Sequence, residues 1–183
     1  GALATSAFVV TNTAAAMAAL TWMTISWWRG GKPSVVGTAT GAVVGLVAIT
    51  PASGYVGPLA AIVIGLGAGI FCYMAIRLRA RLKLDDSLDV WGCHGIGGTW
   101  GALATGLFAS KAINEAGANG LFYGNPGQLG IQLLAVGVTW VWAFGMTFLI
   151  LKILDWTMGL RVSKEEEEVG LDLAQHGERA YQL

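Results

Sequence analysis

Charged residues are scarce in this chain of 183 residues, because lysine, arginine, aspartate and glutamate together make up only 12 % of it. A typical soluble domain carries about 25 %. The 11 basic residues are balanced by 11 acidic ones, which argues against a nucleic-acid-binding surface. Two cysteines are too few for a disulfide scaffold or a four-thiolate zinc site. These shortages exclude several classes of protein before any motif is considered.

Apolar residues and glycine are abundant instead. Hydrophobic residues make up 55 % of the chain, glycine occurs 27 times, and the mean hydropathy is +0.61. A soluble core of this size needs fewer apolar residues, and a soluble surface cannot expose the surplus. The composition also excludes disorder over most of the length. We therefore predict an all-α integral membrane protein, whose few intramembrane polar groups are the candidates for function.

Continuous apolar stretches define the predicted membrane helices. A spanning helix needs roughly 20 apolar residues, and five stretches approach or exceed that length, the second being the shortest. The remaining C-terminal residues are polar and include a run of four glutamates. We therefore predict a membrane domain over residues 1–158 and a cytoplasmic tail over residues 159–183. The predicted spans are residues 2–28, 34–50, 55–76, 88–109 and 128–155.

The basic residues predict the orientation. With five spans, 10 of the 11 lysines and arginines fall on one side of the membrane and only Lys111 falls on the other. The positive-inside rule makes the basic side cytoplasmic, so we expect a cytoplasmic C-terminus in the cytoplasmic (inner) membrane. An odd number of spans with an outside N-terminus is unusual, and the chain begins with Gly1 in apolar sequence. We therefore expect it to be the C-terminal part of a longer protein.

His94 is the main candidate for chemistry, because it lies inside the fourth predicted span. An intramembrane imidazole can relay a proton or accept a hydrogen bond, and the alternative is a histidine satisfied by a neighbouring helix. Cys93 does not form a nucleophile pair with it, since adjacent residues on a helix do not face each other. The two cysteines and two histidines also lack metal-ligand spacing. We expect neither an enzyme nor a cofactor.

Two further features leave alternatives open. Asp86 precedes the fourth span and Asp89 lies at its start, and both suit the N-terminus of a helix, so capping is the favoured interpretation and an acidic pore mouth is the alternative. Glycines at helical spacing permit close helix packing, but thin helices also leave room for a narrow pore. Those glycines are Gly37, Gly41 and Gly45 in the second span and Gly65 and Gly69 in the third. The fourth span is also crowded with glycines, to which the same two interpretations apply: Gly92, Gly95, Gly97, Gly98 and Gly101.

Three motifs, in order, resemble the ammonium transporter (Amt/Mep/Rh) family. The first is Asp-Asp-Ser-Leu-Asp-Val-Trp-Gly-Cys-His-Gly-Ile-Gly-Gly at residues 85–98. The second is Gly-Ala-Val-Val-Gly-Leu-Val at residues 41–47, followed by Thr-Pro-Ala at residues 50–52. The third is in the tail, where Gly-Leu-Arg-Val at residues 159–162 precedes His-Gly-Glu at residues 176–178. The resemblance covers essentially the whole chain.

The resemblance implies a fold of eleven transmembrane helices, built as two inverted five-helix repeats and a long last helix. The five predicted spans would correspond to helices 7–11, and the family assembles as a homotrimer. The implied function is transport of ammonium or ammonia across the cytoplasmic membrane through a hydrophobic pore in each subunit. An ammonium sensor with the same fold, signalling through its cytoplasmic tail, is the alternative.

The resemblance also assigns roles to residues. His94 matches the second histidine of the family's twin-histidine site, and Val90, Val43 and Thr50 match pore-lining positions. The first histidine is not in this chain, so the resemblance implies that the N-terminal half of the same protein is required. The tail resembles the segment that supports binding of a PII-type regulatory protein on the cytoplasmic side. The tail residues implied in that binding are Asp172, His176, Gly177 and Glu178.

Overall fold

The computed structural model of the protein describes residues 1–181. Every regular element within this range is helical, so the predicted all-α class is confirmed. The chain separates into two compact units, Gly1–Gly137 and Val138–Leu183, each of which is described by itself.

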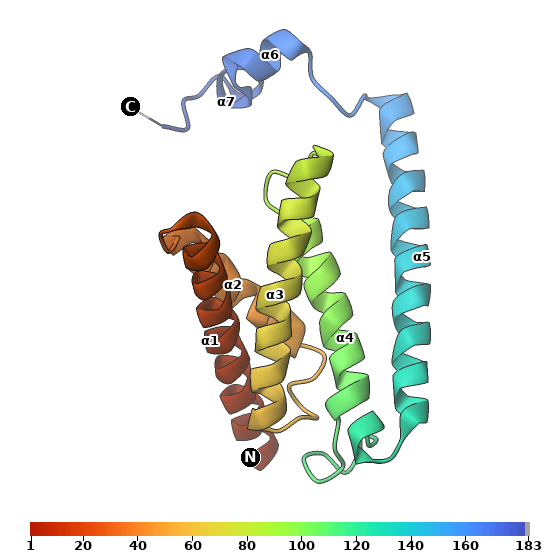
Figure 1. The fold of residues 1–183 in the computed structure, drawn as a ribbon. Coiled ribbons are helices and arrows are strands. Elements are labelled where there is room, and N and C mark those ends of the chain that lie inside the picture. The colour runs from red at the N-terminus through yellow and green to blue at the C-terminus, as the bar shows by residue number, and fades with distance from the viewer. Residues whose placement is uncertain (182–183) are drawn as a thin grey trace. The chain divides into compact units, whose positions relative to one another are not determined.

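The first unit contains a bundle of four α-helices, shown in red to green in Figure 1. The helical elements that begin in this unit are α1 (Ala2–Gly30), α2 (Val35–Ile49), α3 (Pro58–Leu82), η1 (Trp91–Ile96), α4 (Gly97–Phe108), η2 (Leu121–Tyr123) and α5 (Pro126–Thr157). α1 packs against both α2 and α3, and α4 packs against the same two helices from another side. The π-helical segment η1 leads directly into α4 and also contacts α3.

Three of these helices are long and apolar enough to cross a membrane: α1, α3 and α5, with 29, 25 and 32 residues. α2 is apolar but has only 15 residues. A helix of that length is about 22 Å long and falls short of the roughly 30 Å hydrocarbon core. The fourth predicted span is built from η1 and α4 together. Multiple membrane helices are therefore confirmed, while the number of five spans stays a prediction.

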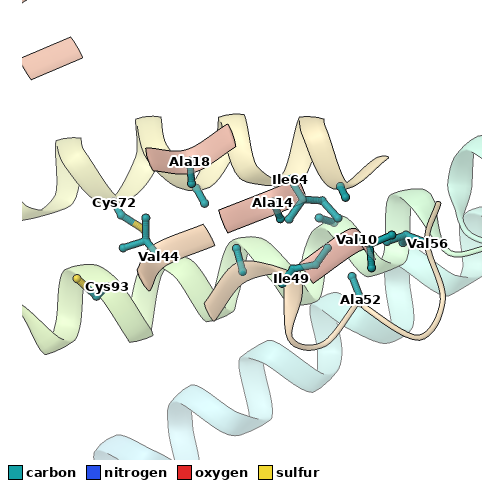
Figure 2. Close-up of a cluster of buried hydrophobic side chains, with 14 of the residues drawn as sticks. Val10, Ala14, Ala18, Val44, Ile49, Ala52, Val56, Ile64, Cys72 and Cys93 are labelled. Carbon is teal, nitrogen blue, oxygen red and sulfur yellow. The ribbon is translucent and has the colours of Figure 1, made fainter. Parts of the chain in front are cut away.

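The core of this unit consists of small and branched apolar residues where α1, α2 and α3 meet (Figure 2). Ala14 of α1 is fully buried there. A methyl group added to Gly45 of α2 would lie 2.5 Å from the Ala14 carbonyl oxygen, and one added to Gly65 of α3 would lie 3.0 Å from its Cα. These glycines therefore serve close helix packing, which is the first of the two interpretations that their spacing allowed.

The second unit contains the rest of α5 and two short helices, α6 (Lys164–Val169) and α7 (Leu171–His176). Ser163 and Glu166 form a reciprocal capping box at the start of α6, in which the Ser163 N–H donates to Glu166 Oε2 over 2.9 Å. The Gln175 side chain of α7 donates to Glu166 Oε1 over 3.0 Å. Hydrogen bonds between polar side chains thus hold the two tail helices together without an apolar core.

Candidate functional site

An apolar hollow of about 480 Å³ lies between the C-terminal half of α2 and the junction of η1 and α4. Most of its lining consists of hydrocarbon, and the imidazole of His94 is the one ionisable group among the lining residues. The residues that line it are Val43, Leu46, Val47, Thr50, Pro51, His94 and Gly98.

His94 is exposed in this chain, although it lies in an apolar segment of sequence. Its imidazole has no hydrogen-bond partner among residues 1–181. Within the described residues, therefore, no neighbouring helix supplies a hydrogen-bond partner for His94, as the alternative interpretation would require. Cys93, the preceding residue, is buried in the core (Figure 2). The two side chains thus have opposite surroundings, as expected for adjacent helical positions.

The helical segment that carries His94 is held at its start by Asp86. The carboxylate of Asp86 accepts hydrogen bonds from the backbone N–H groups of Val90 and Trp91, each over 2.9 Å. The capping role predicted for Asp86 is confirmed. The segment then continues as a π-helix from Trp91 to Ile96, a conformation that is rare and often found at functional sites.

Asp89 has a different role from the capping that its sequence position suggested. Its backbone has a positive φ of 54°, and its carboxylate forms an ion pair with Arg79 of α3. Arg79 Nε and Asp89 Oδ1 are 2.9 Å apart, and the two side chains are only 22 % and 29 % exposed. This ion pair joins α3 to the start of the His94 segment. No sequence signal pairs Arg79 with Asp89, because only the turn between α3 and η1 brings them together.

The structure brings three of the four predicted pore residues together. Val43, Thr50 and His94 line the same hollow, and the Thr50 hydroxyl donates to the Leu46 carbonyl oxygen over 2.7 Å. Val90 is half exposed but does not line the hollow, so its pore-lining role stays a prediction. Gly98, one of the fourth-span glycines for which both interpretations were open, lies one helical turn after His94, and a methyl group there would have no neighbour within 4 Å.

The four predicted tail residues lie on α7 and the turn that ends it. Gly177 has a φ of 68°, which ends α7 in the left-handed conformation that glycine tolerates. The Glu178 N–H donates to the Asp172 carbonyl oxygen over 3.0 Å. The Ala180 N–H donates to the Asp172 carboxylate over 3.0 Å and holds the pKa of that carboxyl below its usual value. Asp172, His176, Gly177 and Glu178 thus form one compact local surface.

Together, the long apolar helices define a polytopic helical membrane protein, and the histidine beside an apolar hollow is its candidate site. The profile of the Ammonium Transporter Family matches residues 1–181, and the chain belongs to this family of non-enzymatic transport proteins. It is 49 % identical to an ammonium transporter of Bacillus subtilis over 177 residues, which cover 96 % of this chain and 44 % of that protein.

Solved structures agree with this assignment. The crystal structure of Candida albicans Mep2 is similar with a TM-score of 0.85 and 40 % identity, over 94 % of this chain and 40 % of that one. A structure described as a sensor Amt protein is similar with a TM-score of 0.84 and 34 % identity, over 96 % of this chain and 42 % of that one. The chain spans less than half the length of the curated relatives it matches.

Proposed function

We propose that this chain forms one side of a pore that transports ammonium or ammonia across the cytoplasmic membrane. The observation that carries the proposal is the imidazole of His94, which faces an apolar hollow without a hydrogen-bond partner in the described residues. A polar group placed in this way is costly unless it binds a partner or a substrate. Membership of the ammonium transporter family supports the identity of that substrate.

The apolar lining supplies a physical basis for selectivity. Moving an ion into an apolar lumen carries a large desolvation cost, whereas a small neutral molecule avoids it. Ammonium can lower this cost by giving up its proton, and His94 is positioned to accept a hydrogen bond or a proton. A potassium ion has no proton to give up and is rejected. The hollow therefore needs no close-fitting cage of ligands to discriminate between two cations of similar size.

The pore requires more than this chain. The hollow is open rather than enclosed, and the chain spans less than half of its relatives' length. We propose that the N-terminal half of the same protein covers the hollow and brings a second histidine to His94, completing a twin-histidine site. In this arrangement the chain supplies helices 7–11 of an eleven-helix fold, with a membrane domain over residues 1–158, in a homotrimer.

Replacement of His94 tests the proposal. In the complete transporter, His94→Ala is expected to change methylammonium uptake and ammonium currents by roughly tenfold or more, the scale of a lost proton-transfer group. Cys93→Ala is the matched control, because Cys93 is adjacent in sequence but buried in the core away from the hollow. Unchanged uptake and unchanged currents in His94→Ala would remove this residue from the pathway.

An ammonium sensor is the second candidate, favoured by the similarity to the sensor Amt structure. A sensor needs to bind ammonium but need not conduct it. Flux in proteoliposomes that contain the purified complete protein separates the two functions. Rapid ammonium-dependent flux supports transport, and binding without flux supports sensing.

We also propose that the cytoplasmic tail, residues 159–183, binds a PII-type regulatory protein. The compact surface of Asp172, His176, Gly177 and Glu178 supports this, because its backbone is ordered by local hydrogen bonds. A surface that is already ordered loses less conformational entropy when a partner binds.

A further inference from the structure

The π-helical segment that carries His94 is anchored to α3 on both sides. Before it, the ion pair between Asp89 and Arg79 joins the segment to the C-terminal part of α3. After it, the Trp100 indole N–H of α4 donates to the backbone carbonyl oxygen of Ile64 in α3 over 2.9 Å. The two anchors enclose the segment from Trp91 to Ile96, so α3 holds both ends of the stretch that sets the direction of the His94 side chain.

The π-helical form lets this stretch approach α3 closely at two glycines. A methyl group added to Gly92 would lie 2.6 Å from Cγ1 of Ile76, and one added to Gly97 would lie 3.3 Å from Sγ of Cys72. In an α-helix, residues five apart point about 140° away from each other, whereas the i→i+5 hydrogen bonds of a π-helix bring them nearer to one face. Gly92 and Gly97 can therefore both lie against α3, while His94 between them is exposed.

Asp89 precedes the π-helix in a backbone conformation that few residues other than glycine adopt. Its φ is 54°, and such a conformation persists where the surrounding contacts hold it. Arg79 supplies that contact, since its Nε lies 2.9 Å from Asp89 Oδ1 and both atoms are buried. Arg79 Nη1 also donates to the Leu84 carbonyl oxygen over 3.4 Å. One guanidinium thus holds both the turn after α3 and the residue from which the π-helical segment starts.

We propose that Arg79 is a positioning residue for transport, which holds the π-helix through its ion pair with Asp89 and thereby directs His94 into the hollow. Without the pair, the Asp89 backbone relaxes and the segment adopts the α-helical hydrogen-bond pattern. Loss of the extra residue in that turn rotates the part before it by about 100°, the angle of one helical residue. His94 then turns away from the hollow. This inference rests on the proposed role of His94 in the pore, although Arg79 itself does not line the hollow.

A double-mutant cycle in the complete transporter tests whether Arg79 acts through His94. Methylammonium uptake, normalised to folded protein, is compared for the wild type, R79Q, H94A and R79Q/H94A. Arg79→Lys keeps the charge and is the conservative variant. Arg81→Gln is the matched control, because Arg81 is an exposed arginine on the same helix. Asp89→Asn removes the other charge of the pair, and asparagine tolerates a positive φ as aspartate does.

R79Q and D89N are each expected to change uptake by about tenfold, in the same direction as H94A, because a displacement of about 1 Å can cost roughly a hundredfold. In the H94A background, R79Q should add less than about a factor of two, since the group that it positions is already absent. R79K and R81Q should both stay within about twofold of the wild type, a range that uncoupled surface changes permit.

Three outcomes would overturn the inference while leaving the pore role of His94 intact: unchanged uptake in R79Q, effects that multiply in R79Q/H94A, or equal losses in R79Q and R81Q. If H94A itself leaves uptake unchanged, the proposed function fails and this inference fails with it. If R79Q does not fold, D89N and D89N/H94A complete the same cycle.

Discussion

Gly98 and Gly101 lie three residues apart on α4, yet the same substitution to alanine is expected to have opposite consequences. A methyl group on Gly101 would lie 2.8 Å from the carbonyl carbon and 3.0 Å from the Cα of Ala48 in α2, which is fully buried. A methyl group on Gly98 would meet nothing within 4 Å and would project beside the His94 hollow. Gly101→Ala therefore perturbs the fold, whereas Gly98→Ala perturbs the proposed pore.

The expected difference in stability between the two variants follows from helix propensity and from overpacking. Both substitutions gain about 1 kcal/mol of helix propensity, and this gain cancels when the two variants are compared. At Gly101 the clash is with the backbone of α2, which cannot move aside as a flexible side chain would. Overpacking of this kind costs about 1–3 kcal/mol and occasionally more. We therefore expect Gly101→Ala to be less stable than Gly98→Ala by about 3 kcal/mol.

Two measurements on the complete transporter check this pair. Thermal unfolding in detergent should show a lower Tm for Gly101→Ala and an unchanged or higher Tm for Gly98→Ala. Methylammonium uptake, normalised to folded protein, should fall for Gly98→Ala. Equal stability of the two variants would refute the close approach of α4 to α2 at Gly101. Normal uptake by Gly98→Ala would show that the space beside His94 is not part of the transport path.

Two further predictions concern the tail. Replacing Asp172, His176 and Glu178 together by alanine should weaken inhibition of uptake by a PII-type protein and leave uptake in its absence unchanged; full inhibition of this variant would contradict the proposed binding surface. The hydrogen bonds from Ser163 lower the pKa of Glu166 below its ordinary 4.5, so they stabilise the tail fully above that pH and are lost as the pH falls through the lowered pKa. In an NMR titration of the tail, the midpoint of Glu166 should lie below its ordinary 4.5, and a midpoint at or above that value would show that the capping box does not form.

Much of the fold could be predicted from the sequence, because burial in lipid requires long apolar segments that composition reveals. The spans at the positions of α1 and α5 were predicted within two residues of their observed bounds, whereas α3 continues six residues beyond the predicted end at residue 76. The fourth span begins at Trp91 rather than residue 88, since Asp86 caps the segment and Asp89 has a positive φ. Side-chain capping and backbone conformation depend on local geometry, which apolarity alone does not indicate.

The candidate site could be predicted only in part. An ionisable residue inside an apolar span can be identified from the sequence, and His94 was recognised as a candidate functional residue in this way. For Gly98 the sequence left close packing and a narrow pore both open, because a glycine that packs against a neighbouring helix and one that faces open space are indistinguishable in the sequence. The structure separates them: Gly45 meets the backbone of α1, whereas Gly98 meets nothing.

By itself, the sequence determined that this is a helical membrane protein of the ammonium transporter family, since apolar length, the distribution of basic residues and the motif around His94 are all properties of one linear chain. Only the tertiary structure decided which residues share a surface. It placed Val43 and Thr50 beside His94 and paired Arg79 with Asp89. The physical reason is that such contacts depend on how closely glycine and alanine let the helices approach, and that distance is set by all the helices together.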